Sequence, residues 1–157
     1  MEKRIRGITF EIPNEYGKWL YHILRPLDCT KYNWLIGPGE EYKSVDHELV
    51  SLFPPGQDRV DGEVLMGFID TEEAQYIIHL DLKAYSSVVA SQLKTYEDYL
   101  ASDCELVLLI VDCIYTTIYC KDSETLDKLA ANAEALHVRS LNYITDANDH
   151  RTGLGVW

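Results

Sequence analysis

The sequence lacks the patterns by which common catalytic and metal-binding sites are recognised. No two of its four cysteines form a C-x-x-C pair, and its five histidines show no H-x-x-x-H or H-E-x-x-H spacing. It contains no G-x-S-x-G elbow, and the Gly37-Pro38-Gly39 turn is not followed by the G-K-[ST] of a phosphate loop. These absences leave zinc hydrolases, α/β-hydrolases and P-loop enzymes without support. The sequence predicts neither a metal ion nor a cofactor.

Basic residues and long apolar runs are also scarce. Lys and Arg number 14 against 26 Asp and Glu, which gives a formal net charge of -12. Nucleic-acid binding depends on Lys and Arg contacts to phosphate, and the one basic cluster, Lys3–Arg6, is too short to supply them. No apolar run reaches the 18 or so residues that a membrane span needs. We therefore expect no nucleic-acid partner and no membrane partner, whereas a basic protein is the partner that such an acidic surface attracts.

The cysteines bear on the compartment. Three of the four (Cys29, Cys104, Cys113 and Cys120) lie in or beside apolar strand sequence, where a free cysteine packs as a small hydrophobic residue. No signal-peptide pattern is present at the N-terminus. Reduced cysteines without an export signal indicate a cytoplasmic protein.

Hydrophobic periodicity predicts an α+β fold, and the length of 157 residues fits a single globular domain. Apolar residues alternate or run together over 8–12, 32–36, 76–84, 106–111, 114–120 and 138–145, which predicts strands. Helical spacing occurs over 14–24, 44–53, 64–69, 96–102 and 123–136. Strands and helices interleave without strict alternation. The expected architecture is therefore a mixed, mostly antiparallel sheet of about six strands with helices packed against it.

Two of these helices depend on a proposed N-cap. Asn14 follows the strand-ending Pro13 and can accept an orphan amide hydrogen bond, so a helix is expected from there to Leu24. Ser44 is the expected N-cap of the helix over 44–53, which ends at two prolines.

The loop after the last strand is the most unusual segment. Five polar or charged side chains follow one another almost directly: Asp146, Asn148, Asp149, His150 and Arg151. In the functional interpretation, His150 is an acid–base group, Asp149 orients it, Asp146 assists, and Arg151 clamps an anionic substrate. In the alternative interpretation, Asn and Asp bond their own backbone and the segment is only a turn.

A second candidate lies on the third strand. His79, Asp81, Lys83 and Tyr85 alternate with apolar residues and therefore share one face. On an open face they are ordinary solvated side chains, whereas on a covered face they would form a chemically active row. If His79 and Asp81 lie near the 146–151 loop, the two candidates form one ligand site.

Tyrosine is abundant, with 11 copies against three phenylalanines. Tyr115 and Tyr119 share a strand face, and tyrosines often anchor protein interfaces because each combines an apolar ring with a polar tip. The same rings can instead pack beneath helices. We also expect Leu154–Trp157 to dock onto the domain as an edge strand or as a plug over the sheet, because an unanchored terminal Trp would expose a large ring.

Several phrases of the sequence resemble an uncharacterised family. They are RGITFEIPNEYG (Arg6–Gly17), WLIGPGEEY (Trp34–Tyr42), YEDYLASDCELVLLIVD (Tyr96–Asp112), YCKD (Tyr119–Asp122) and YITDANDHRTGLGVW (Tyr143–Trp157). The family consists of small proteins from Gram-positive, mostly spore-forming bacteria and is classed as a domain of unknown function. The resemblance implies a bacterial cytoplasmic protein and carries no activity or cofactor.

Two functional hypotheses follow. The first is a protein-binding module, immunity-type or regulatory, whose acidic surface and tyrosines meet a basic partner. The second is a small enzyme or ligand-binding protein that uses the Asp146–Arg151 loop, with Asn148, His79 and Asp81 as further ligand contacts. The absence of a catalytic motif favours the first.

Overall fold

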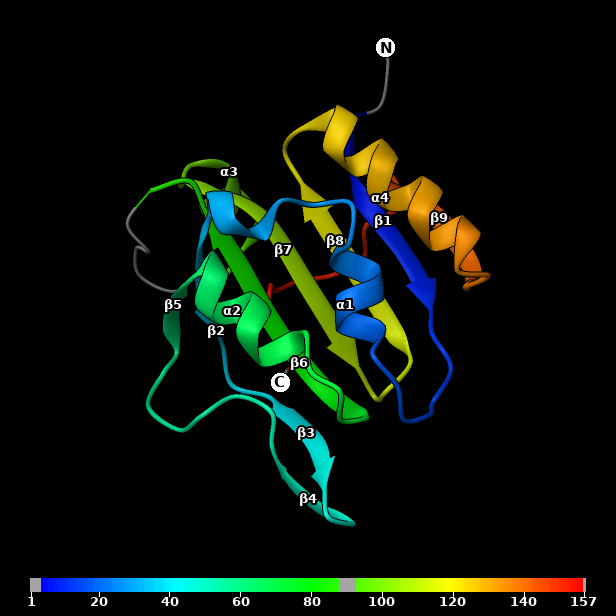
Figure 1. The fold of residues 1–157 in the computed structure, drawn as a ribbon. Coiled ribbons are helices and arrows are strands. Elements are labelled where there is room, and N and C mark those ends of the chain that lie inside the picture. The colour runs from blue at the N-terminus through cyan, green and yellow to red at the C-terminus, as the bar shows by residue number, and fades with distance from the viewer. Residues whose placement is uncertain (1–3, 88–92, 157) are drawn as a thin grey trace.

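The structure, a computed structural model, describes residues 4–87 and 93–156, and its fold is α+β as expected (Figure 1). The strands are β1 (Ile5–Glu11), β2 (Asn33–Ile36), β3 (Glu40–Val45), β4 (Glu48–Ser51), β5 (Arg59–Asp61), β6 (Gln75–Tyr85), β7 (Cys104–Val111), β8 (Tyr115–Cys120) and β9 (Arg139–Thr145). The helices are α1 (Trp19–Leu24), the 3-10 turn η1 (Cys29–Lys31), α2 (Gly62–Ile69), α3 (Tyr96–Leu100) and α4 (Ser123–Ala135).

Within the described residues a nine-stranded sheet replaces the expected sheet of about six strands. Its main path runs β4-β3-β6-β7-β8-β1-β9, and β2 pairs with both β6 and β5. The strand pairs are antiparallel, so the sheet is not mixed. The additional strands β3, β4 and β5 arise from segments whose periodicity was helix-like or absent.

The hairpin β3–β4 corrects the helix predicted over 44–53. The apolar residues of this segment match helical spacing, but Asp46 and His47 have φ values of 50° and 68°. Two consecutive positive φ angles form the two-residue turn that suits the twist of a hairpin. The extended form is held by pairing between β3 and β6, a non-local contact that local periodicity does not report.

The first helix also begins later than predicted. It starts at Trp19, and its N-cap Lys18 makes no side-chain cap. Asn14 instead accepts a hydrogen bond of 2.7 Å from the Tyr76 hydroxyl. Gly17 pairs with Gln75 in an isolated antiparallel bridge. The segment before the helix is thus held against the start of β6 in a non-helical conformation.

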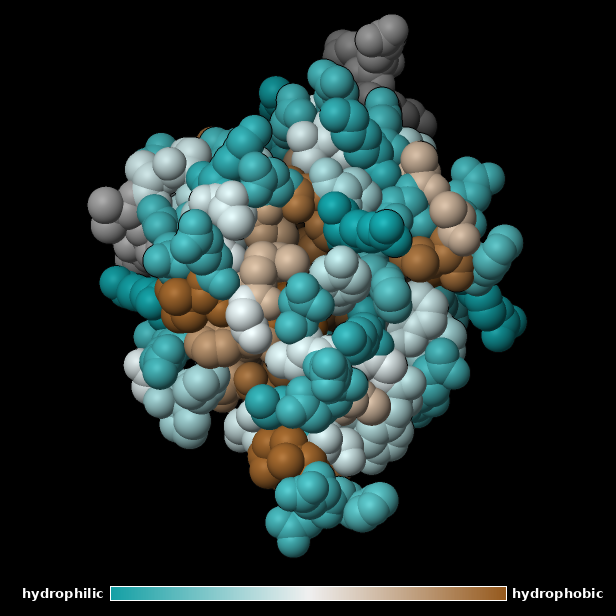
Figure 2. Space-filling view, viewed as in Figure 1, coloured by the Kyte–Doolittle hydropathy of each residue, from teal (hydrophilic) through white to brown (hydrophobic). Residues whose placement is uncertain are grey.

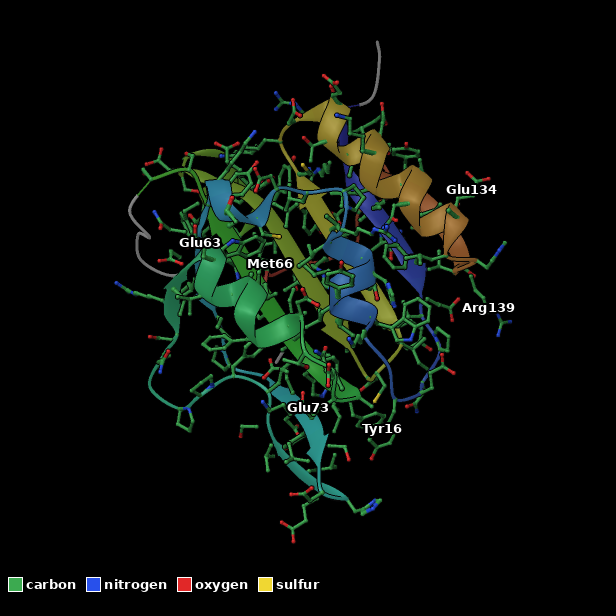
Figure 3. All side chains as sticks on the ribbon, viewed as in Figure 1. Tyr16, Glu63, Met66, Glu73, Glu134 and Arg139 are labelled. Atoms are coloured by element: carbon green, nitrogen blue, oxygen red, sulfur yellow. The ribbon has the colours of Figure 1, made fainter. Side chains whose placement is uncertain are left out.

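One face of the sheet is covered by α1, α2 and α4, which lie in front of it in Figure 1. The main core lies between them and includes Ile8, Leu80, Leu82, Leu108 and Ile118. The outer sides of the helices are polar, with Glu63 on α2 and Glu134 on α4 exposed (Figure 3).

The opposite face carries a smaller core beneath α3 and the C-terminal segment, whose red trace passes behind the sheet in Figure 1. Leu35, Tyr85, Tyr99, Tyr119 and Leu154 form its centre. The docking predicted for 154–157 is confirmed at Leu154, which is buried as a plug over the sheet, while Trp157 lies outside the described residues. Both faces of the central strands are therefore covered.

The four cysteines are free thiols, and all but Cys113 are buried. No helix in the described part of the chain is long and apolar enough to cross a membrane.

Candidate functional site

The candidate site begins on β6, whose alternation places Leu80 and Leu82 in the main core and Asp81, Lys83 and Tyr85 on the opposite face. Because α3 and the C-terminal segment cover that face, the polar row is not solvated as an open face would require. Asp81 is 6% exposed and Lys83 is 4% exposed. The structure thus corrects the open-face interpretation.

Asp81 and Lys83 form a buried ion pair. Lys83 Nζ donates to Asp81 Oδ1 at 2.5 Å and to the carbonyl oxygen of Leu154 at 2.9 Å. Burial raises the pKa of the Asp81 carboxyl, and the charges of Lys83 and Arg151 only partly oppose this effect. A pair in such surroundings loses hydration that its mutual attraction does not fully repay, so it is weak evidence of a stabilising role.

A cavity of about 280 Å³ lies over this ion pair. Its charged lining residues are Asp81, Lys83 and Lys94. Its apolar lining residues are Leu35, Pro38, Leu93, Leu154 and Val156. Charged groups on the floor and apolar groups on the walls are typical of small-molecule sites.

The turn between β2 and β3 closes tightly over Asp81. A Cβ atom on Gly37 would lie 2.7 Å from the Asp81 carboxyl, and one on Gly39 would lie closer still to Glu41 Oε1. Glycine is therefore needed at both positions for the turn to approach these two carboxyl groups.

Glu41 lies on the other side of this turn. Its Oε1 atom is buried and has no hydrogen-bond partner among the residues that the structure describes. Burial raises the pKa of Glu41 to about 8, with further contributions from the negative charges of Asp81 and Glu40. The Glu41 carboxyl is thus largely protonated at neutral pH, and it lines a second hollow of about 280 Å³.

Tyr85 ends the polar row. Its ring is fully buried, and its hydroxyl has no hydrogen-bond partner within residues 4–87 and 93–156. Burial raises its pKa to about 12, helped by the nearby Cys104 and Asp81. Buried polar atoms without partners are few in native proteins, so this hydroxyl is one of the unusual features of the covered face.

The loop after β9 is ordered by contacts with β1 and β8. Arg6 binds Asp146 at 2.7 Å and Asp149 at 3.2 Å, and its guanidinium lies 3.9 Å from the centre of the Tyr96 ring. The Tyr119 hydroxyl donates to Asp149 at 3.0 Å. These charge-assisted contacts fix the loop against the sheet.

The structure separates the proposed acid–base group from its orienting carboxylate. His150 is exposed and makes no hydrogen bond to the residues that the structure describes. Asp149 is occupied by Arg6, Tyr119 and the backbone N–H of Arg151. The predicted pairing of His150 with Asp149 is therefore wrong, because Asp149 faces the sheet and His150 faces solvent.

Asn148 and Arg151 bind their own chain. The side-chain oxygen of Asn148 accepts from the Thr145 N–H at 2.7 Å, as the turn interpretation of this loop predicts. Arg151 Nη1 donates to the Gly155 carbonyl oxygen at 3.0 Å, so it clamps the C-terminal segment rather than a substrate. Its charge still reaches Asp81. Arg151 of the loop is thus close enough to Asp81 to lower its pKa, whereas His79 lies apart, against Asp112 of the β7–β8 turn.

The two tyrosines proposed for an interface have opposite surroundings. Tyr115 is 54% exposed, whereas Tyr119 is 1% exposed. The ring of Tyr119 packs against Tyr96 and Tyr99 beneath α3. The prediction that Tyr119 faces a partner is therefore corrected.

The sequence identified Asp81 but not Glu41. The phrase Gly37–Glu41 predicts only a turn. The signal in it is a pair of glycines before two carboxylates, because glycine lets the backbone approach charged groups closely. The sequence does not show that the Asp81 face of β6 is covered, because the cover is formed by α3 and the C-terminal segment.

Comparisons with known proteins agree with the resemblance seen in the sequence. A family model described as "Protein of unknown function (DUF2691)" matches residues 5–155. The "Uncharacterized protein YncE" of Bacillus subtilis (strain 168) is 42% identical over 154 residues, which cover 96% of this chain and 99% of that protein. No solved structure matches the chain. The predicted membership of an uncharacterised Gram-positive family is confirmed.

Proposed function

The chain belongs to the DUF2691 family of proteins of unknown function, and we propose from its geometry that it is a small-molecule-binding protein. The site is the cavity over β6, between the Gly37–Gly39 turn and the C-terminal segment. The observation that carries the proposal is the buried Asp81–Lys83 pair on the cavity floor. The proposal includes cytoplasmic residence, as the reduced cysteines predicted.

Energetics favour a functional role for this pair. Replacing a buried ion pair by apolar residues of similar volume is often neutral or stabilising, so packing alone does not require it. Ionisable groups with perturbed pKa values beside a cavity are instead typical of binding and catalytic sites. Asp81 also raises the pKa values of Glu41 and Tyr85, two neighbouring groups that do not line the cavity, so the charge on the cavity floor acts on the residues around it.

The convergence of two chain segments also supports this function. The C-terminal segment reaches the cavity because Arg6, Tyr119 and Arg151 fix the preceding loop. The Asp146–Arg151 loop then supports one wall of the cavity. The groups that contact a ligand are Asp81 and Lys83 rather than His150.

The test uses backbone amide NMR spectra of the full chain. Hexanoate, hexylamine and hexanol are added separately, because they share one apolar body and differ in charge. We expect at least one of them to shift the amide signals of Gly37, Asp81, Lys83 and Gly155 more than those of α4.

A cavity-filling variant provides the control. A Cβ atom on Gly155 meets nothing within 4 Å, and the same holds for Gly67 on α2. Gly155→Leu is expected to abolish the shifts, while Gly67→Leu keeps them. If none of the three probes shifts the cavity residues, the proposed function is wrong.

A second candidate function is binding of a protein partner at the β3–β4 hairpin, and the net charge of -12 favours a basic partner. This hairpin projects from the body in Figure 1, and an apolar group lies on it at the lower edge of Figure 2. Leu49 and Val50 are exposed there, on a strand that has β3 as its only neighbour in the sheet described. The test is a pull-down at low salt, in which the unaltered chain and the Leu49→Lys/Val50→Lys variant are each used as bait. This function is supported if a basic protein binds the unaltered chain stoichiometrically, is released by a salt step and does not bind the variant. The absence of such a protein would oppose it.

A further inference from the structure

The cavity over β6 differs in charge from the rest of the molecule. The chain has 14 basic residues against 26 acidic ones, yet the cavity is lined by two lysines and one carboxylate. Arg151 adds positive charge close enough to act on Asp81. Such a local excess of positive charge in an acidic protein attracts an anion to this position and repels one elsewhere.

Lys83 has a hydrogen-bond donor to spare. An ammonium group carries three N–H donors, and the described contacts of Lys83 use two of them, to Asp81 and to Leu154. The side chain is almost fully buried, so bulk water does not readily satisfy the third. A group with an oxygen acceptor inside the cavity would complete it.

The C-terminal wall supplies further donors. The backbone N–H groups of Gly155 and Val156 donate no hydrogen bond within the described part of the chain, and both residues line the cavity. The Gly155 carbonyl oxygen, in contrast, is already taken by Arg151. Within the described residues the N–H groups of Gly155 and Val156 are thus available as donors, which suit an anion.

The remaining walls are apolar. Leu35, Pro38, Leu93 and Val156 line the cavity beside the charged floor. A ligand that fills it therefore needs an apolar body as well as an anionic head, since inorganic anions would leave these walls uncovered.

We propose that the ligand is a small carboxylic acid with an apolar body, whose carboxylate binds Lys83 and the backbone N–H groups of the C-terminal segment. This inference rests on the proposed function and names its ligand class. Asp81 holds Lys83 in place and competes with the ligand for its charge.

The competition gives a test that a purely structural ion pair would fail. Asp81→Asn keeps an acceptor for Lys83 but removes the competing charge, so hexanoate should bind about tenfold more tightly or better. Asp81→Asn/Lys83→Gln has no charge on the cavity floor and keeps an amide hydrogen bond, so hexanoate binding should fall by about tenfold or more below that of the unaltered protein. Circular dichroism verifies that both variants fold, and Lys128→Gln on the exposed side of α4 is the matched control.

Calorimetric titration with hexanoate, hexylamine and inorganic phosphate separates the outcomes. The inference is supported if hexanoate binds most tightly to Asp81→Asn and most weakly to Asp81→Asn/Lys83→Gln, and if hexylamine and phosphate bind more weakly than hexanoate or not at all. Tighter binding of hexylamine or of phosphate overturns the carboxylic-acid class but leaves a ligand site in the cavity. Equal hexanoate affinity in all variants also overturns the inference, because Lys83 would then not be the anion contact.

Discussion

Lys83 on β6 donates a hydrogen bond of 2.9 Å to the backbone carbonyl oxygen of Leu154, so the C-terminal segment is fastened to the middle of the sheet. The N–H of Leu154 donates in turn to the Lys94 carbonyl oxygen just before α3. Leu154 thus links strand β6 to the segment that leads into α3. The shape of the cavity therefore depends on the docking of the C-terminal segment.

The first prediction concerns Leu154, whose side chain is buried in the second core. Leu154→Ala should lower the free energy of unfolding by about 2–3 kcal/mol, which corresponds to a fall of about 4–12 °C in the thermal midpoint. Leu100, at the end of α3, is exposed and provides the control, because Leu100→Ala should change stability by about 0.5 kcal/mol or less. Equal effects of the two substitutions would show that the C-terminal segment is not docked in solution.

The second prediction is a pH dependence caused by Glu41. Its pKa is raised from 4.5 to about 8 in the folded protein, so the folded state keeps a proton that the unfolded chain releases above pH 4.5. The associated stability is complete below pH 4.5, falls as the pH rises, and is lost above about pH 8. Glu41→Gln is permanently neutral and should therefore gain stability relative to the unaltered protein between pH 5 and 9.

Thermal midpoints of both proteins across this range would check the trend. Asp81→Asn supplies the control, because removing the neighbouring charge lowers the pKa of Glu41, so the fall in stability still begins near pH 4.5 but ends at a lower pH and is smaller. A difference between Glu41→Gln and the unaltered protein that stays constant from pH 5 to 9 would contradict a buried, protonated Glu41.

The sequence was sufficient for strands whose periodicity agrees with their tertiary contacts. The alternation along β6 and the continuous apolar run of β7 were both identified, because those strands are covered on defined faces. The strands expected over 106–111 and 114–120 correspond to β7 and β8, which pair antiparallel, and the turn residues between them, Asp112 and Cys113, have φ values of 53° and 69°. Here local pattern and non-local pairing favour the same structure.

The failures have a common physical cause, which is contact between segments distant in sequence. Leu49 and Val50 match a helical stripe, but pairing of β3 with β6 makes their segment a hairpin. Asp81 was placed on the correct face of β6, but whether that face is covered depends on residues about 70 positions later. The sequence therefore predicts the row of polar residues on β6 but not the C-terminal segment that covers this row.

The third prediction addresses the β3–β4 turn. His47 has a φ of 68°, a conformation that costs a residue with a side chain about 1–2 kcal/mol. His47→Gly should raise stability by up to about 1 kcal/mol, since the greater freedom of glycine in the unfolded chain offsets part of the gain. Urea unfolding measures the change. His22→Gly within α1 is the matched substitution and should lower stability by about 1 kcal/mol, so a loss of stability at both positions would contradict the hairpin.

The last prediction connects the Tyr119–Asp149 hydrogen bond to the cavity wall. The Asp149 side chain is almost fully buried, and besides Arg6 its side-chain donor is the Tyr119 hydroxyl. Tyr119→Phe keeps the ring packed under α3 but leaves the carboxylate short of a donor, which should cost about 1–3 kcal/mol.

The matched substitution is Tyr143→Phe, because Tyr143 also donates to a carboxylate, that of Asp127, but at an exposed position. Exposed carboxylates recover such a bond from water, so stability should fall by about 0.5 kcal/mol or less. Hydrogen exchange should accelerate over residues 146–153 in Tyr119→Phe and stay unchanged in Tyr143→Phe. Because this loop leads directly to Gly155 and Val156, the same substitution should weaken ligand binding without touching the cavity floor. Unchanged exchange over the loop would mean that Asp149 does not hold the wall in place.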